Sequence, residues 1–343
     1  MKKILSEISF IRPILIVLLV TYHAFAPFSD AWSHPVGFAE STAYRWLDYV
    51  VYSIMLESFV FISGYVYAYQ IIVLGKKYSL VGLVKKKFIR LIIPCLLFGI
   101  LYQCLFSKND NLKESFILLL SGTGHLWFLP MLFWCFLELW ILLKINTSNV
   151  VRSVIVLFLV FIANIGFPLQ ISQSLFYLPF FYMGYIFYSK NSCFREHATL
   201  STIICLWVTF IVAFVLFKNA KLCIDTLFEN HIGLSTIERS GLLATRLLLK
   251  YTYPTVGLLA LYMTSLRYTS CRIINDRVIK FGEYCFGIYI FQQFVLRFLY
   301  YYTMIPNIID SSYLPWLGCL LAMVLSFAFS YAICLTSWGR KII

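Results

Sequence analysis

Long apolar segments dominate this sequence and constrain its fold more than any other feature. Hydrophobic residues make up 61% of the 343 positions and charged residues only 13%, so too few polar side chains remain to coat a soluble globule. A helix needs about 20 consecutive apolar residues to cross a bilayer. We predict an all-α, polytopic membrane protein, a bundle of about ten transmembrane helices at 8–28, 49–73, 88–106, 126–144, 150–167, 172–189, 199–217, 243–266, 280–303 and 314–337.

The placement of lysine and arginine predicts how this bundle is oriented. Basic residues in short loops are retained on the cytoplasmic side. With the N-terminus in the cytoplasm, eighteen Lys and Arg fall in cytoplasmic segments and six in outer ones. An even number of helices then places both termini in the cytoplasm. No small-residue cleavage site follows the first segment, so we expect a retained helix rather than a signal peptide.

The net charge of +13 follows from these basic loops facing anionic lipid. Membrane lipids are therefore expected partners, and nucleic acid is not. The ten cysteines fall mostly inside predicted helices without the paired spacing of zinc sites, so we expect reduced packing residues and no metal. No repeat or low-complexity linker divides the chain, and residues 1–343 are expected to form a single integral-membrane domain.

Several ionisable residues stand inside predicted helices, where each costs about 2.5–3.5 kcal/mol on insertion scales and becomes a functional candidate. In the predicted orientation they come from different helices but lie at similar depth, toward the outer side. They are His23, Glu57, His125 and Arg297, with Gln292 and Gln293 one turn before Arg297. This arrangement predicts a shared polar cavity in the outer half of the bundle.

Structural alternatives exist for these residues. Glu57 and Arg297 could form an internal ion pair that fixes helix packing, and His23 could be a neutral, hydrogen-bonded histidine between helices. Arg246 and Lys250 are expected to extend toward the lipid headgroups.

Two predicted outer loops, 29–48 and 218–242, are long enough to have structure of their own. The first contains Trp32 and Trp46, and the second contains Asp225, Glu229, His231 and Glu238. They could cover an outward cavity, or they could be solvated connectors with aromatic anchors at the interface.

Two basic features stand toward the predicted cytoplasmic side. Arg12 precedes His23 by eleven residues, almost three helical turns, so both side chains lie on one face about 16 Å apart along the axis. A second run, Lys85-Lys86-Lys87-Phe88-Ile89-Arg90, leads directly into the third segment. Dense Lys and Arg suit phosphates. Ordinary positive-inside anchoring is the alternative.

Five stretches together resemble the motifs of the membrane acyltransferase 3 family, in order along nearly the whole chain. They are Arg12 to His23, Glu57 to Tyr65, Lys87 to Pro94, His125 to Pro130 and Phe286 to Gln292. Two positions depart from the family pattern, which commonly has arginine at Lys87 and often histidine at Gln292.

The resemblance implies a ten-helix enzyme of the bacterial plasma (inner) membrane. Such an enzyme moves an acyl group, usually acetyl, from cytoplasmic acyl-CoA to a sugar hydroxyl of a cell-envelope polysaccharide, such as an O-antigen, or of a lipid-linked glycan. Acyl-CoA and the glycan are the implied partners, and no cofactor is bound permanently. The resemblance also places the helix 1 histidine at the centre of catalysis and the basic motif on the CoA phosphates.

Residue chemistry gives a compatible mechanism. Acyl transfer to a hydroxyl needs a general base, and histidine is the natural one because its ordinary pKa is near working pH. We predict His23 as the base, with Glu57 as a partner that orients it. Arg12, Lys87 and Arg90 are predicted to hold the phosphates of CoA.

The acceptor end is predicted from the remaining candidates. His125 and Trp127 would line it, Ser63 or Tyr289 would donate a hydrogen bond to the oxyanion, and Arg297 would contact substrate. An alternative function is a transporter or flippase for an anionic glycolipid, since intramembrane charges also mark transport paths. The sequence shows no inverted repeat or pair of interrupted helices to support it.

Overall fold

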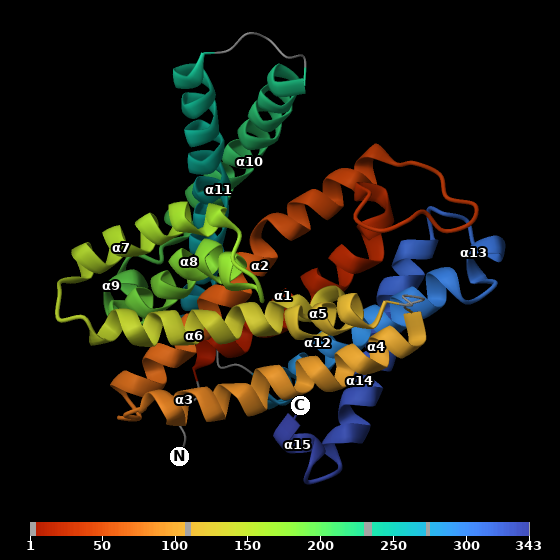
Figure 1. The fold of residues 1–343 in the computed structure, drawn as a ribbon, viewed down its shortest axis with the longest axis horizontal. Helices are drawn as coiled ribbons and strands as arrows, with labels where there is room; N and C mark the ends of the chain where they lie inside the picture. Colours follow the sequence, from red (N-terminus) through yellow and green to blue (C-terminus); the bar gives the residue numbers. More distant parts are fainter. Residues whose placement is uncertain (1–4, 107–110, 230–234, 272–274, 343) are drawn as a thin grey trace.

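A computed structural model describes residues 5–106, 111–229, 235–271 and 275–342, and every regular element in these ranges is helical. Figure 1 shows their arrangement. In chain order the elements are α1 (Ser6–Phe25), η1 (Ala26–Ser29), α2 (Thr42–Ile72), α3 (Leu80–Lys87), η2 (Phe88–Ile92), α4 (Ile93–Phe106), α5 (Leu112–Ser121), η3 (Gly124–Trp127), α6 (Phe128–Lys144), α7 (Asn149–Ile162), η4 (Ala163–Ile165), α8 (Ile171–Ser189), α9 (Asn191–Glu196), α10 (Leu200–Glu229), α11 (Thr236–Cys271), α12 (Asp276–Tyr301), α13 (Ile305–Ile308), α14 (Leu314–Cys334) and α15 (Gly339–Ile342).

Within the described residues, six helical stretches are long and apolar enough to cross a membrane: Ser6–Ser29, Thr42–Ile72, Leu80–Phe106, Gly124–Lys144, Leu200–Thr226 and Leu314–Cys334. The other four predicted segments are also helical, in α7 with η4, α8, α11 and α12, but they do not combine the same length and hydropathy. The chain is thus an all-helical, multi-pass membrane protein.

The count of ten spans and the cytoplasmic position of both termini remain predictions. Lys2, Lys3, Lys108 and Arg272 contributed to the charge count but lie outside the described residues, as does the side chain of Lys341.

Helix α1 lies at the centre of the bundle and packs against α2, α11, α12 and α14. Its apolar side chains are buried around most of its circumference, as in Ile11, Leu15, Ile16 and Val20, each no more than 1% exposed. A helix that is apolar on all sides needs partners on all sides. The central place of α1 positions Arg12 and His23 inside the bundle.

A buried polar network fixes the N-terminal end of α1. The Tyr65 hydroxyl on α2 donates to Glu7 Oε1 at 2.5 Å, and the Asn191 amide on α9 donates to the same oxygen at 3.2 Å. Arg195 Nη2 lies 3.8 Å from Glu7 Oε2. Because Glu7 is only 5% exposed, these partners are needed to compensate its burial. The network therefore fixes α1 against α2 and α9.

Two glycines let α2 and α8 approach backbone to backbone. A Cβ atom at Gly64 would lie 1.9 Å from the Phe181 carbonyl oxygen, and one at Gly184 would lie 2.1 Å from the Phe61 carbonyl oxygen. Small residues at such crossings are typical of helices packed within membranes. The motif from Glu57 to Tyr65 thus has a packing role through Gly64 and a polar role through Tyr65.

A π-helical turn follows the lysine run of α3. The Ile93 amide donates to the Phe88 carbonyl, five residues back, to close this turn. Pro94 follows and has no N–H to donate to the Arg90 carbonyl four residues back, so the α-helical ladder is interrupted here. Such turns are frequent at functional sites.

The predicted outer loops have different outcomes. Most of 218–242 is helical, because α10 and α11 extend as a hairpin beyond the other helices (Figure 1), so a loop of that length is wrong. Asp225 and Arg246 pair across this hairpin at 3.1 Å. His231 and the side chain of Glu229 lie outside the described residues.

Segment 29–48 instead folds back onto the bundle. The Tyr301 hydroxyl donates to the Ser33 carbonyl at 2.6 Å, and Arg45 Nε donates to the Phe28 carbonyl at 3.0 Å. Trp32 is only 9% exposed and lines the interior cavity described below. This segment therefore covers the cavity, as one of the two predictions for it stated.

Candidate active site

A cavity of about 680 Å³ runs along α1 and is lined also by α2, α6 and α12. Its volume falls within the roughly 300–1,000 Å³ of typical small-molecule sites. Arg12 lines one end, called here the basic end, and His23 lines the other, the histidine end. Eleven residues of helix separate them by about 16 Å along the axis. The predicted common face of these two residues is confirmed.

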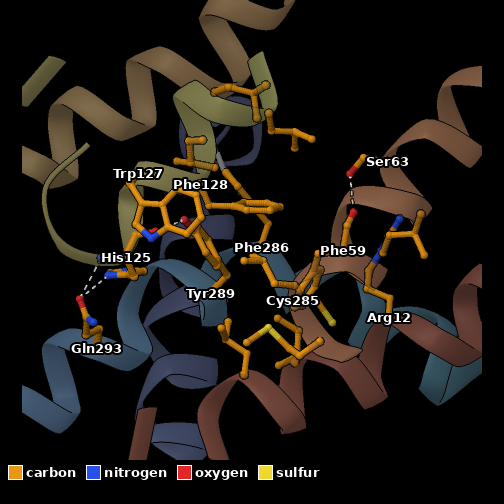
Figure 2. A pocket seen from close by; sticks show the side chains of 18 of the residues that line it. Arg12, Phe59, Ser63, His125, Trp127, Phe128, Cys285, Phe286, Tyr289 and Gln293 are labelled. Atoms are coloured by element: carbon orange, nitrogen blue, oxygen red, sulfur yellow. Dashed lines mark hydrogen bonds between the residues drawn. The ribbon is translucent and has the colours of Figure 1, made fainter. Parts of the chain in front are cut away.

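Nine of the ten predicted site residues line this cavity. They are Arg12, His23, Ser63, Lys87, Arg90, His125, Trp127, Tyr289 and Arg297. Figure 2 shows His125 and Trp127 on the opposite side of the cavity from Arg12 and Ser63, with Tyr289 nearer to His125 than to Arg12. The sequence motifs therefore converge on one space, although they are spread from residue 12 to residue 297.

The basic end gathers three cations from two separate segments. Arg12 comes from α1, whereas Lys87 ends α3 and Arg90 lies in the π-helical turn. Lys87 is 7% exposed, and its Nζ lies 3.2 Å from the centre of the Phe136 ring. None of the three forms an ion pair with a described residue, and Glu283 is the only acidic side chain lining the cavity. Unpaired basic groups of this kind suit a polyanion.

His23 is the residue placed best to act on a substrate at the other end. It is 7% exposed and lines the cavity, with the His125 ring centre 6.1 Å away and the Trp32 ring centre 5.8 Å away. Its Nδ1 atom is buried and has no hydrogen-bond partner among the described residues. Gln292 on α12 is placed to hydrogen-bond this ring, so the alternative of a histidine hydrogen-bonded between helices remains a prediction.

Gln292 on α12 lies beside the His23 ring. It is fully buried, and neither its amide nitrogen nor its amide oxygen has a hydrogen-bond partner in the described part of the chain. Buried amides are nearly always hydrogen-bonded. The juxtaposition of two unpartnered polar groups, Gln292 and Nδ1 of His23, is therefore the most unusual feature of this end.

His125 is fixed rather than free. Its Nδ1 lies 2.7 Å from Gln293 Oε1, its Nε2 lies 2.9 Å from the Ile290 carbonyl oxygen, and its backbone N–H donates to Gln293 Oε1 at 3.1 Å. The Tyr289 hydroxyl donates to the His125 carbonyl at 2.7 Å. The ring therefore connects η3 to α12 and supports the wall of the cavity.

Two predicted oxyanion donors are already engaged with backbone. Ser63 Oγ donates to the Phe59 carbonyl at 2.9 Å, shown as a dashed line in Figure 2, and the single hydroxyl hydrogen of Tyr289 is used on His125. Either residue would have to release that bond before donating to a substrate.

Glu57 is the predicted site residue that the structure places elsewhere. It does not line the cavity, and the nearest polar groups that act on His23 are His125, Gln292 and Arg297. The reason is helical geometry: Met55, Phe59 and Ser63 face the cavity, and Glu57 points about 160° away from Met55 around the helix. The structure therefore gives no support to its predicted role as the orienting partner of His23. No ion pair forms between Glu57 and Arg297 either.

Trp32 and Tyr102 were not among the sequence candidates, although both lie at the histidine end. Both rings lie near the Arg297 guanidinium. Trp32 stands in a loop and Tyr102 in an apolar helix, so neither had a spacing that would distinguish it from many other aromatic residues. Gln292 did carry a signal, as one of few amides within an apolar segment.

A comparison with family models matches residues 5–335 to an acyltransferase domain. No curated protein and no solved structure matches the chain significantly.

Proposed function

Because the chain belongs to the acyltransferase 3 family, a family of membrane acyltransferases, we propose that it moves an acyl group, most simply acetyl, from acyl-CoA to a sugar hydroxyl. The acceptor would be an envelope polysaccharide or a lipid-linked glycan. The observation that carries the proposal is the single cavity joining three unpaired cations to a buried histidine.

The basic end suits the donor. CoA carries its phosphates at one end of the molecule and its thioester at the other, separated by the pantetheine arm. Arg12, Lys87 and Arg90 would bind the phosphates, with the arginines offering planar forks and the lysine a point charge. The thioester would then lie at the histidine end. In the predicted orientation the basic end faces the cytoplasm of a bacterial plasma membrane, where acyl-CoA is made.

The chemistry at the histidine end is a direct displacement. The acceptor hydroxyl oxygen forms a bond to the thioester carbonyl carbon, and the carbon–sulfur bond then breaks. His23 takes the hydroxyl proton as the oxygen attacks and returns it to the CoA sulfur, so free thiol and O-acyl sugar are the products. Ser63 or Tyr289 would stabilise the oxyanion after releasing its carbonyl partner.

Gln292 replaces Glu57 as the positioning residue in this mechanism. An imidazole that acts as a base through Nε2 must carry its proton on Nδ1. Accepting that Nδ1–H with the Gln292 amide oxygen would fix the tautomer and the ring orientation, since a second hydrogen bond determines which nitrogen is available. It would also pair the two unpartnered groups described above.

The test is release of free thiol from acetyl-CoA by purified protein in the presence of envelope glycan. We expect His23→Ala to abolish release and to abolish O-acetyl sugar, while the exposed His197→Ala keeps full turnover. Gln292→Leu should lower kcat with little change in the KM for acetyl-CoA, and Glu57→Gln should retain more activity than Gln292→Leu. Full turnover by His23→Ala would refute the mechanism, and passage of glycan across vesicles without acyl transfer would favour a transporter.

A further inference from the structure

Arg297 is a cation without a counter-ion at the histidine end of the cavity. It lines the cavity from α12, and none of the four ion pairs among the described residues includes it. Its Nε atom is buried and has no hydrogen-bond partner there. Glu283, the acidic side chain that lines the cavity, stands fourteen residues earlier on the same helix, which is about 21 Å along the axis.

Aromatic rings surround the guanidinium instead of carboxylates. Its carbon lies 5.0 Å from the centre of the Trp32 ring, 5.8 Å from that of Tyr102 and 5.9 Å from that of Tyr301. Ring faces attract a cation but accept few of its five N–H donors. Most N–H donors of Arg297 therefore remain available to an oxyanion, and the ring of Trp32 lies near both Arg297 and His23.

The basic end already accounts for the phosphates of a donor, since Arg12, Lys87 and Arg90 gather there. A charge at the opposite end, beside His23, is placed to act on the second substrate. We propose that the acceptor glycan carries an acidic group, a carboxylate or a phosphate, which pairs with Arg297 close to the hydroxyl that is acylated. The flat, apolar face of Trp32 suits the C–H face of the same sugar. This inference rests on the acyl transfer proposed above.

Paired probes test this inference without requiring turnover. Purified protein in detergent is titrated with an oligosaccharide of glucuronic acid, with its carboxyl-reduced glucose counterpart and with glucose 6-phosphate, and thermal unfolding is followed. We expect an acidic probe, and not the neutral one, to raise the unfolding temperature. Arg297→Gln should remove this preference. Arg297→Lys should retain it with weaker binding, because lysine keeps the positive charge but lacks the planar guanidinium that binds an oxyanion through two N–H groups.

Arg246→Gln is the matched control, because Arg246 pairs with Asp225 on the hairpin away from the cavity. It should keep the preference for the acidic probe. Equal stabilisation by acidic and neutral probes, or a preference that persists in Arg297→Gln, would overturn the inference.

Turnover then separates this inference from the proposed function. With acetyl-CoA as donor, the ratio of kcat/KM for the acidic acceptor to that for the neutral one should fall at least about tenfold in Arg297→Gln. An equal loss for both acceptors would mean that Arg297 acts on the reacting group and would refute the inference. If acidic probes bind through Arg297 but no acyl transfer occurs, only the proposed function fails.

Discussion

Adding one methyl group at Gly64 should separate two helices and reduce activity. An ideal Cβ there lies 1.9 Å from the Phe181 carbonyl oxygen, whereas real Cβ contacts essentially never fall below 3.0 Å. The backbones of α2 and α8 must therefore move apart by at least about 1.1 Å. The obstacle is backbone rather than a flexible side chain, so the cost of Gly64→Ala should lie toward the upper part of the ~1–3 kcal/mol typical of overpacking.

The same displacement reaches the cavity, because Ser63 and Phe59 line it from α2. A misplacement of about 1 Å can reduce turnover by about 10²-fold. We expect Gly64→Ala to unfold at lower temperature in detergent and to turn over acetyl-CoA far more slowly, and Gly184→Ala to behave in the same way. Gly241→Ala is the control, because no atom lies within 4 Å of its added Cβ. Wild-type stability and turnover in both crossing variants would refute this account of the motif.

Two further perturbations address the donor site and the network around α1. In steady-state kinetics, Arg12→Gln or Arg90→Gln should raise the KM for acetyl-CoA by at least about tenfold, since a hydrogen bond to a charged group contributes about 1.5–3 kcal/mol. The KM for the acceptor should not change. An equal rise in both KM values would contradict this role of the basic end. Tyr65→Phe removes a donor to buried Glu7 and should lower the free energy of unfolding by about 1–3 kcal/mol without changing the acetyl-CoA KM; unchanged stability in a denaturation series would count against the network.

The sequence predicted the cavity well because its motifs sit at helical spacing. Arg12 and His23 share a face by arithmetic alone, and Lys87 with Arg90 stands directly before an apolar segment. Which helices meet across the cavity is a tertiary property, yet the ionisable residues inside the predicted helices were expensive enough in a membrane to predict that they avoid lipid. The structure brings those faces together.

Glu57 shows where such reasoning fails. Cost at membrane depth predicts that a carboxyl group avoids lipid, but it does not say which protein surface the group faces. Ser63 and Glu57 belong to one motif and one helix, yet their side chains point about 120° apart around it. Only the packing of α2 determines that Ser63 faces the cavity and Glu57 does not.

Length and loops were predicted less well for a related reason. The α10–α11 hairpin continues as helix through charged positions beyond the predicted segments, such as Asp225 and Glu238, and Asp225 pairs with Arg246 across it. A prediction from hydropathy ends a transmembrane segment where charged residues begin. It contains no information on ion pairs between helices that come together only in the folded protein.

The most direct test of the central claim is the position of acetyl-CoA in a structure of the complex. We predict CoA phosphates against Arg12, Lys87 and Arg90, the pantetheine arm along α1, and the thioester carbon within reach of a hydroxyl held by His23 Nε2. Acetyl-CoA bound outside this cavity, or bound with its thioester at the basic end, would contradict the account.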